Sequence, residues 1–526
     1  MNDVSSKVDI DDIPSMYNAA SHFVDRHLEE GREDKDAFID DRGSYSYAEL
    51  ARRVNKCANL LTGLGLRQEA RIALVMLDTI DYPAMFWGAI KAGIVPVCVN
   101  TLLTTDNYRY ILGNGRAQVL VVSEALLPAF LPMLSDLPTL EKVIVVGSEG
   151  QGHPLLEELQ ASASDEFRAV ATSRDDIAFW LNSSGSTGNP KGVKHRHSSP
   201  YWVAELYGRQ VLGMREDDVV FSAAKLFFAY GIGNANFFPL LLGATSVLMA
   251  ERPTPDSVMR VLKRHQPTIF GGVPTLYAAL LADPNNNRDA GSDRLRMCIS
   301  AGEALPEDIG NTWKQRFGVD ILDGVGSTEM LHIFLSNRPD DIRYGTSGKM
   351  VPGYEGKLVD DRGQTVAPGE LGELVVNGPS AADGYWNERE KSIRTFVGPW
   401  TYTGDKYTQD GEGYYHYCGR SDDMFKSGGN WVSPFEVESA LSAHVKVLEA
   451  AVVPSEDEHG NMKPRAFVVL QQGVEPGEQL AEELKSFVRE SIELWKYPRW
   501  IEFRDELPKT ATGKIQRYKL RIPDPG

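Results

Sequence analysis

The chain has 526 residues, of which 42% are hydrophobic and 24% are charged, as is typical of folded globular proteins. Its 55 Lys and Arg against 73 Asp and Glu give a formal net charge of −18, which argues against a nucleic-acid backbone as a partner. The four cysteines form no CxxC pair, which excludes a disulfide scaffold and a cysteine metal site. The acidic first residues lack a secretory apolar stretch, and no apolar run reaches the roughly 20 residues that span a bilayer. We expect a cytoplasmic protein without a membrane or nucleic-acid partner.

Short apolar runs of strand length alternate with helix-compatible stretches through the first three quarters of the chain. Two of the helix-compatible stretches are residues 82–93 and 126–134. Runs of this length that are apolar throughout are typical of strands buried on both faces of a parallel sheet. The pattern therefore predicts an α/β fold with layered βαβ sheets. The predicted strands are residues 71–77, 94–100, 117–123, 142–147, 177–184, 245–249, 268–273, 296–302 and 319–326.

The residue composition and the pattern of apolar runs change twice towards the end of the sequence. After about Gly345, short strand-like runs separated by Gly, Pro and Asp indicate a small β-rich section. From about Gly419, two strand-like runs, a helix and a third strand-like run at residues 500–507 predict a compact α+β unit. That helix carries an apolar stripe at helical spacing, which we interpret as core packing. The stripe consists of Leu480, Leu484, Phe487, Val488 and Ile492.

A loop rich in Gly, Ser and Thr follows the strand predicted at residues 177–184. It runs from Ser183 to Gly192, and it combines glycines that allow tight turns with hydroxyl donors and the ammonium of Lys191. Such a loop suits a polyphosphate. It does not have the spacing of a Walker A loop, because its lysine follows a proline and precedes a glycine. A flexible surface loop is the alternative interpretation.

Two further motifs follow predicted parallel strands at their carboxyl ends, where open α/β sheets bind ligands. Gly302–Pro306 has the sequence GEALP and Gly326–Glu329 has the sequence GSTE. Glu329, beside a phosphate loop, could hold Mg²⁺, which prefers oxygen ligands. Alternatively, Glu329 is a favourable charge at the start of a helix.

Three polar motifs occur in the last quarter. Asp405 in YTGD and Arg420 in GRSDD could hold the two hydroxyls of a ribose, or form a surface ion pair at a turn. The glycine pair of KSGGN suits a hinge or a close approach of the backbone. Near the end, residues 508–517 form a cationic loop, PKTATGKIQR, which alone would be read as a solvated tail.

Together and in this order, the motifs resemble those of the adenylate-forming superfamily of acyl- and aryl-CoA synthetases, luciferases and peptide-synthetase adenylation domains. Within it, residues 227–234 (FFAYGIGN) and 329–334 (EMLHIF) are most similar to bacterial benzoate–CoA ligases. The resemblance implies an adenylation domain at residues 1–419, whose β-rich section is about 345–419. It also implies a hinge at 420–422 and a small mobile domain at 423–526.

The resemblance implies two half-reactions. A carboxylate attacks the α-phosphorus of ATP bound with Mg²⁺, and CoA then displaces AMP from the acyl-AMP. The implied catalytic residues are Lys514, Thr328 and Glu329, of which Glu329 would also bind the metal. Asp422 would be the hinge residue, and Lys426, Ser427, Gly428 and Gly429 would border the CoA tunnel. The implied nucleotide-binding residues are Ser183, Ser184, Gly185, Ser186, Thr187, Gly188, Lys191, Gly302, Glu303, Ala304, Asp323, Gly324, Val325, Gly326, Ser327, Asp405 and Arg420.

One position departs from the family pattern, since Val325 stands where many relatives have a tyrosine that stacks on adenine. The adenine would then lie between apolar surface and the backbone near Glu303 and Ala304, while Asp323 is placed to meet its amino group. The implied acyl pocket mixes aromatic and small residues, which suits a flat aromatic acid. Its residues are Phe228, Ala229, Tyr230, Ile232, Ala301, His332 and Ile333, with Gly302 and Gly326 beside them.

Several alternatives stay open. The acid could be another aryl or medium-chain acid, the enzyme could load a carrier protein, or the chain could be a catalytically silent nucleotide-binding protein. An amino-acid substrate is disfavoured, because no Asp occurs between Phe227 and Asn236. His332 either bonds a ring substituent or fills a wall, and we interpret His195–His197 as surface or structural residues. The family context also suggests a homodimer and acetylation of Lys514 by a lysine acetyltransferase.

Overall fold

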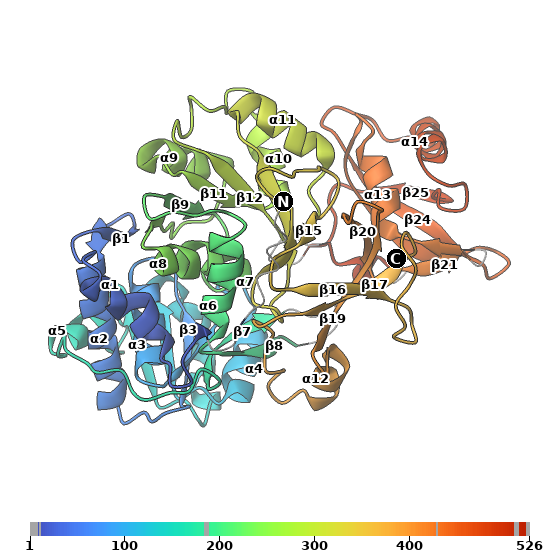
Figure 1. Cartoon of the computed structure of the whole chain (residues 1–526). Coiled ribbons are helices and arrows are strands. Elements are labelled where there is room, and N and C mark those ends of the chain that lie inside the picture. Colours follow the sequence, from blue (N-terminus) through green and yellow to red (C-terminus); the bar gives the residue numbers. More distant parts are fainter. Residues whose placement is uncertain (1–8, 10–11, 184–188, 428–429, 510–514, 522–526) are drawn as a thin grey trace. The chain divides into compact units, whose positions relative to one another are not determined.

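The computed structural model describes residue 9 and residues 12–183, 189–427, 430–509 and 515–521. The chain divides into two compact units. The first contains Met1–Gly356 and Val376–Thr401, and the second contains Lys357–Val375 and Tyr402–Gly526. Figure 1 labels many of the elements of both units.

A six-stranded sheet near the start of the first unit has the strand order β6-β5-β3-β4-β7-β8. Its strands are parallel except for the last pair, β7 and β8. The predicted strands between residues 71 and 184 are therefore confirmed, whereas the return strand β8 was not predicted. The strands are β3 (Arg71–Val75), β4 (Val95–Cys98), β5 (Val119–Ser123), β6 (Lys142–Val146), β7 (Ile177–Ser183) and β8 (Lys191–Arg196).

A nine-stranded sheet completes the main layers of this unit, in the order β15-β14-β13-β12-β11-β9-β10-β1-β2. The strands from β1 to β13 along this order are parallel, and β2, β14 and β15 are antiparallel additions. The α/β prediction is confirmed. The strands are β1 (Asp36–Ile39), β2 (Ser44–Ser46), β9 (Val219–Ser222), β10 (Thr245–Val247), β11 (Ile269–Gly272), β12 (Met297–Ser300), β13 (Ile321–Gly326), β14 (Ile333–Ser336) and β15 (Lys349–Met350).

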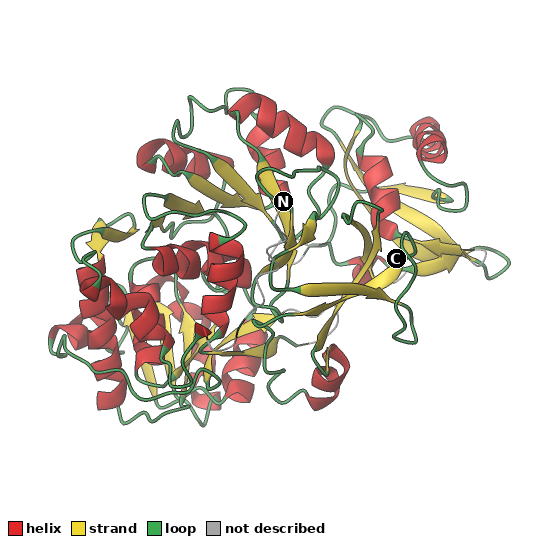
Figure 2. Ribbon diagram, viewed as in Figure 1, coloured by secondary structure: helices red, strands yellow, loops and turns green. Residues whose placement is uncertain are grey.

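Helices connect and flank these strands (Figure 2). The helix expected at residues 126–134 is instead two 3₁₀ turns, Glu124–Ala129 and Leu131–Asp136, because Pro128 and Pro132 interrupt the helical hydrogen bonds. In the described part of the chain, no helix has the length and apolarity to cross a bilayer. The helices are α1 (Arg26–Glu29), α2 (Tyr47–Gly63), α3 (Asp81–Lys91), α4 (Thr105–Gly115), α5 (Leu156–Ala161), α6 (Ser199–Val203), α7 (Ala229–Ile232), α8 (Phe238–Leu242), α9 (Pro255–His265), α10 (Pro274–Ala282), α11 (Glu307–Phe317) and α12 (Arg389–Thr395).

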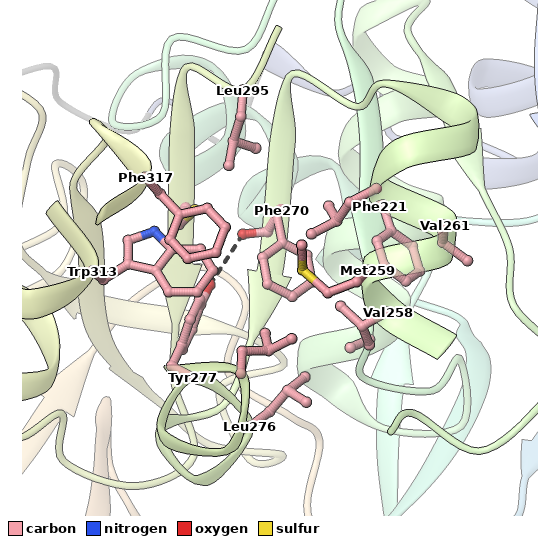
Figure 3. Packing of buried hydrophobic residues seen from close by; sticks show 14 of the residues in the cluster. Phe221, Val258, Met259, Val261, Phe270, Leu276, Tyr277, Leu295, Trp313 and Phe317 are labelled. Carbon is pink, nitrogen blue, oxygen red and sulfur yellow. Dashed lines mark hydrogen bonds between the residues drawn. The ribbon is translucent and has the colours of Figure 1, made fainter. Parts of the chain in front are cut away.

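Aromatic side chains fix helices α10 and α11 against the nine-stranded sheet (Figure 3). Trp313 and Phe317 of α11 stack with ring centroids 3.8 Å apart. Tyr277 of α10 meets the edge of Trp313, and its hydroxyl lies 3.3 Å from the carbonyl oxygen of Phe270 in β11. This core holds β12 and β13 in register, and the candidate site begins where those two strands end.

The second unit is richer in antiparallel strands. A five-stranded sheet, which carries the chain across the unit boundaries, contains β16 (Glu355–Val359), β17 (Gly372–Asn377), β18 (Phe396–Val397), β19 (Trp400–Gln409) and β20 (Tyr415–Arg420). It is followed by the hairpin of β21 (Phe425–Ser427) and β22 (Asn430–Val432), and then by the three-stranded sheet of β23 (Val447–Glu456), β24 (Met462–Leu470) and β25 (Trp500–Phe503). Its helices are α13 (Pro434–Ser442), α14 (Glu478–Ser491) and α15 (Arg517–Leu520). The predicted apolar stripe of α14 is confirmed for Leu480, Leu484 and Val488, which are buried in one core cluster. Ile492 lies just beyond the helix and packs partly buried against this cluster, whereas Phe487 is half-buried outside it.

Gly88 sets the close packing of helices α2 and α3. A Cβ at this position would lie 2.5 Å from the Cβ of Cys57 and 2.9 Å from the carbonyl oxygen of Val54. We therefore expect Gly88→Ala to lower the free energy of unfolding by about 1–3 kcal/mol through overpacking, although alanine is the better helix former. Thermal unfolding would measure the change. Gly113→Ala in α4 is the control, because its Cβ would make an ordinary contact at 3.7 Å, and equal melting temperatures of the two variants would contradict the interpretation.

Candidate functional site

The predicted phosphate loop closes the hairpin between β7 and β8. Ser183 pairs with Lys191 at the mouth of this hairpin, so the loop is held at both ends by the sheet. The Ser183 Oγ is buried, and no described residue gives it a hydrogen bond. The Lys191 ammonium lies 4.2 Å from the ring centroid of Tyr385. Ser184, Gly185, Ser186, Thr187 and Gly188 lie outside the described residues.

The GSTE motif forms the tight connection between β13 and β14. A Cβ on Gly324 would lie 2.9 Å from Ile333, and one on Gly326 would lie 2.5 Å from the carbonyl oxygen of His332, so both positions exclude larger residues. In the turn itself, the Ser327 hydroxyl accepts a hydrogen bond from the backbone N–H of Met330. These contacts place Thr328 and Glu329 half-buried at the end of the sheet, as the sequence motif predicts.

A tyrosine outside the predicted set holds the carboxylate of Glu329. The Tyr385 hydroxyl donates a hydrogen bond of 2.8 Å to Glu329 Oε1. The backbone carbonyl of Glu329 also accepts a 2.8 Å bond from the N–H of Ala382, three residues before Tyr385. No sequence signal marked Tyr385, because its role depends on a contact between segments 56 residues apart.

The residues near Glu329 fit a Mg²⁺ ion that enters with a nucleotide. Among the residues that the structure describes, no cluster of three or more His, Cys, Asp and Glu side chains could hold a metal. A protein cage for a resident ion is therefore missing from that part of the chain. One carboxylate is nevertheless a fitting ligand for Mg²⁺, which usually keeps several waters and binds through one or two carboxylates plus phosphate oxygens.

Asp323 is a buried carboxyl group at the end of β13 whose environment favours its neutral form. Burial raises its pKa to about 7, against the lowering effect of the N–H of Leu305 that bonds its Oδ2 at 3.3 Å. Its other oxygen, Oδ1, is buried and has no hydrogen-bond partner among the described residues. This oxygen is available to an incoming donor such as the amino group of adenine.

The loop after β12 lies next to Asp323. Ala301 is buried, whereas Gly302 is exposed and adopts a φ of 94°, which L side chains rarely adopt. Glu303 and Ala304 are half-buried, and Leu305 carries the N–H that bonds Asp323. The structure therefore brings the two strand-end motifs together at one sheet edge, as the parallel-strand argument predicts.

The predicted acyl-pocket residues come from the start of helix α7 and from the β13–β14 connection. Phe228 is the N-cap of α7, and Ala229 and Tyr230 are half-buried in its first turn. The carboxylate of Asp78, which follows β3, accepts a bond from the N–H of Leu226 and so anchors the chain before α7. The Tyr230 hydroxyl lies 2.8 Å from the carbonyl oxygen of Ile299 and 3.0 Å from that of Gly272.

His332 forms a buried wall beside Tyr230. Its ring lies 4.6 Å from the ring of Phe238 and 5.7 Å from that of Tyr230. Burial lowers its pKa to about 3, so the imidazole is neutral. Its Nε2 lies 3.2 Å from the carbonyl oxygen of Tyr230 and must donate, which assigns Nδ1 as an acceptor. Nδ1 is buried and has no bond to the residues described.

Ile232 and Ile333 are also buried. The histidines of the HRH segment play a structural part, since His195 stacks on Phe179 and His197 Nδ1 accepts the N–H of Ala19. Burial lowers the pKa of both imidazoles and keeps them neutral.

The predicted ribose pair lies in the second unit. Asp405 and Arg420 face each other across β19 and β20, and the Arg420 guanidinium donates 3.0 Å bonds to Asp405 Oδ1 and to the carbonyl oxygen of Thr403. Asp422 is exposed. In the following hairpin, Lys426 is exposed and lies over the ring of Trp431, whereas Ser427 is buried. Gly428 and Gly429 lie outside the described residues.

The segment that carries Lys514 is anchored on both sides, although Lys514 itself lies outside the described residues. Lys509 and Ile515 pair as an isolated bridge, and the N–H of Gln516 bonds the carbonyl oxygen of Pro508 at 2.8 Å. Arg517 then forms a two-pronged ion pair with Glu438, with bonds of 2.8 and 2.6 Å.

The comparisons with known proteins agree with this arrangement. The model of the AMP-binding enzyme family matches residues 24–386, and that of the AMP-binding enzyme C-terminal domain matches residues 436–514. The chain belongs to the AMP-binding enzyme family. The two matches lie on either side of the predicted hinge residue Asp422.

Relatives of this AMP-binding enzyme match it over almost their whole length. The benzoate–CoA ligase of Thauera aromatica is 58% identical over 511 residues, which are 97% of this chain and 96% of that protein. A 4-hydroxybenzoate–CoA/benzoate–CoA ligase of Rhodopseudomonas palustris is 56% identical, with 96% and 94% covered. The crystal structure of a benzoate CoA ligase from Burkholderia xenovorans LB400 has a TM-score of 0.89 at 52% identity, with 96% and 100% covered.

The raised pKa of Asp323 predicts a pH-dependent preference for adenine. The ionised carboxylate offers Oδ1 as an acceptor to the adenine amino group, whereas a proton on Oδ1 would make that oxygen a donor. The affinity for ATP relative to ITP should therefore rise as the pH rises through about 7. At one pH unit below that pKa, only about a tenth of the Asp323 carboxyl groups are ionised. The ratio of the ATP affinity to the ITP affinity should then be about tenfold below the value that it reaches at high pH. Calorimetric titrations of both nucleotides at several pH values would measure it.

ITP is the matched control, because it carries the same triphosphate but a 6-oxo group in place of the amino group. Asp323→Asn should abolish the pH dependence of the ratio. A ratio that stays constant across this pH range in the unaltered chain would contradict the assignment of Asp323.

Proposed function

We propose that this chain is a benzoate–CoA ligase that forms benzoyl-CoA, AMP and pyrophosphate from benzoate, ATP and CoA. The observation that carries the proposal is the character of the acyl wall, in which a neutral, buried His332 packs among aromatic rings beside Tyr230. Such a wall suits a flat, uncharged ring and disfavours a flexible chain or an α-amino group. The near full-length similarity to benzoate–CoA ligases supports the same acid.

In the first half-reaction, a benzoate oxygen attacks the α-phosphorus and pyrophosphate leaves. The hairpin of Ser183 and Lys191 would receive the outer phosphates, while Thr328 and Glu329 line the strand end beside them. Mg²⁺ bound with ATP would supply charge neutralisation there. The reaction at phosphorus depends mainly on such positioning and on charge.

In the second half-reaction, the CoA sulfur attacks the carbonyl carbon of benzoyl-AMP, and AMP leaves as the thioester forms. Asp405 and Arg420 would hold the ribose hydroxyls. We assign residues 1–419 to the adenylation domain, 420–422 to a hinge with Asp422 at its centre, and 423–526 to a domain that moves between the half-reactions. Lys426, Ser427, Gly428 and Gly429 would border the path of CoA after this movement.

A second aromatic acid is favoured by one specific observation. His332 Nδ1 is a buried acceptor, and a hydroxyl or amino substituent of the ring could donate to it. One relative at 56% identity is named for 4-hydroxybenzoate as well as benzoate. The proposal further includes a cytoplasmic location, a homodimer and acetylation at Lys514, which are predictions from the family resemblance.

Acid profiling tests the proposed function directly. We expect AMP and thioester formation with benzoate, and much weaker turnover with acetate, octanoate and 4-coumarate, because the rigid wall around Tyr230 excludes chains and long ring substituents. Anthranilate and 4-hydroxybenzoate distinguish a strict benzoate pocket from one that uses His332 Nδ1. AMP formation without a thioester would contradict the CoA ligase assignment, and turnover only with aliphatic acids would contradict the pocket.

Lys514 is predicted to act in the first half-reaction only. Lys514→Ala should lower benzoyl-AMP formation by about a hundredfold or more, as expected when a cation on the developing charge is lost. Thioester formation from supplied benzoyl-AMP should stay within about threefold of the unaltered enzyme, since a role in only one half-reaction leaves the other barrier unchanged. Lys509→Ala, which removes a nearby cation, is the control. Equal losses in both half-reactions would contradict the assignment.

A further inference from the structure

Tyr385 contacts both charged groups that the proposed reaction assigns to the phosphates. Its hydroxyl donates to Glu329 Oε1 at 2.8 Å, and the face of its ring receives the Lys191 ammonium at 4.2 Å from the centroid. The side chain is 6% exposed, so both interactions are largely shielded from water. One residue therefore connects the lysine of the phosphate loop with the carboxylate assigned to Mg²⁺.

The backbone around Tyr385 fixes this contact. The segment from Ala382 to Trp386 runs along strand β8, where Val193 and Tyr385 form an antiparallel bridge. Three backbone bonds support the pairing, namely Lys194 N–H to Gly384 O at 3.1 Å, Asp383 N–H to Lys194 O at 2.8 Å and Trp386 N–H to Gly192 O at 2.8 Å. At its other end, the segment bonds the backbone of Glu329 through the N–H of Ala382.

The side chains around the ring restrict its orientation. Tyr385 packs in a small cluster with Val193 and Ala382, and its ring lies 5.5 Å from that of Phe396. Its N–H donates a 3.0 Å hydrogen bond to the hydroxyl of Ser392 in helix α12. The phenol group therefore meets Glu329 in a geometry that the chain sets before any ligand binds.

We propose that Tyr385 is a positioning residue for the metal–phosphate end of ATP, an inference that rests on the proposed function. By donating to Oε1, the phenol restrains the rotation of the Glu329 carboxylate and so directs the remaining electron pairs towards Mg²⁺. The ring holds the Lys191 ammonium over its face, which limits the freedom of that long side chain. Both groups are thereby preorganised for one polyphosphate.

The test is the binding of ATP without acid or CoA, so that no turnover occurs. Calorimetry would compare Mg·ATP with metal-free ATP in EDTA for the full-length chain and for Tyr385→Phe, which keeps the ring and loses only the hydroxyl. We expect Mg·ATP to bind about tenfold more weakly to the variant, the order of effect expected for a lost hydrogen bond to a charged group. The affinity for metal-free ATP should change by less than about twofold, because the ring of the phenylalanine keeps the contact with the Lys191 ammonium.

Tyr354→Phe is the matched control, since it also removes a buried tyrosine hydroxyl, one that bonds the Ser380 hydroxyl at 2.7 Å. It should leave both affinities unchanged, even if its melting temperature falls as much as that of Tyr385→Phe. Tyr385→Leu also removes the ring that contacts the Lys191 ammonium, so it should weaken the binding of metal-free ATP as well as that of Mg·ATP. Thermal unfolding would verify that every variant is folded.

Equal Mg·ATP affinity in Tyr385→Phe and the unaltered chain would overturn the inference. Equal weakening of Mg·ATP and metal-free ATP would also overturn it, because the hydroxyl would then act through the fold rather than through Glu329. The proposed function is tested separately by benzoyl-CoA formation in the unaltered chain. If the unaltered chain forms no benzoyl-CoA but Tyr385→Phe still weakens the binding of Mg·ATP, the proposed ligase function would be rejected. The positioning role of Tyr385 would then be kept.

Discussion

The antiparallel return of β14 against β13 is the constraint on which the candidate site depends. Within 11 residues, from Asp323 to Ile333, this hairpin carries the buried carboxyl group, the half-buried Glu329 and the histidine wall. The strands can approach this closely only because Gly324 and Gly326 leave room for Ile333 and for the backbone of His332. A side chain at either glycine would therefore move several functional groups at once, although none of them is mutated.

Two carboxyl groups on the same hairpin are given different electrostatic environments. Asp323 is only 4% exposed, and burial raises its pKa to about 7. Glu329 is half-buried, and its Oε1 accepts a hydrogen bond from the phenol hydroxyl of Tyr385. If Asp323 meets the adenine and Glu329 meets Mg²⁺, as proposed, then burial and hydrogen bonding distinguish two side chains that carry the same functional group.

Much of the fold could be predicted because the signals are local. The apolar runs that became β3 to β7 and β10 to β13 are strands buried on both faces, and the stripe of α14 follows from its own periodicity. The strands of the two large sheets that were missed are β1, β2, β8, β9, β14 and β15. Of these, β2 and β8 carry several polar residues, whereas β1, β9, β14 and β15 are runs of two to four residues, too short to stand out in the sequence. The helix expected at residues 126–134 failed because two prolines outweigh its apolar composition.

The same distinction holds for the site. Motif residues such as Ser183, Lys191 and Glu329 could be named from the sequence because each belongs to a short motif at or just beyond the end of a predicted strand. Tyr385 could not, because its contact with Glu329 depends on how a distant segment pairs with β8. Side chains that bind ligand leave a local signature, whereas those that orient them are visible only in the tertiary structure.

In the proposed acyl pocket, the buried Nδ1 of His332 need not weaken the binding of an apolar ring. His332 Nδ1 is buried and has no hydrogen bond to the described residues, so benzoate bound as proposed would break no hydrogen bond between Nδ1 and those residues. The unpaired acceptor lowers the stability of the folded chain, and it does not lower the affinity for the acid, because it is unpaired both before and after binding. A ring donor that reached Nδ1 would gain a bond at no further cost in desolvating the histidine. In the proposed pocket, the neutral imidazole would therefore accept an unsubstituted ring, and it would favour a hydroxyl or amino substituent only where that group can reach Nδ1.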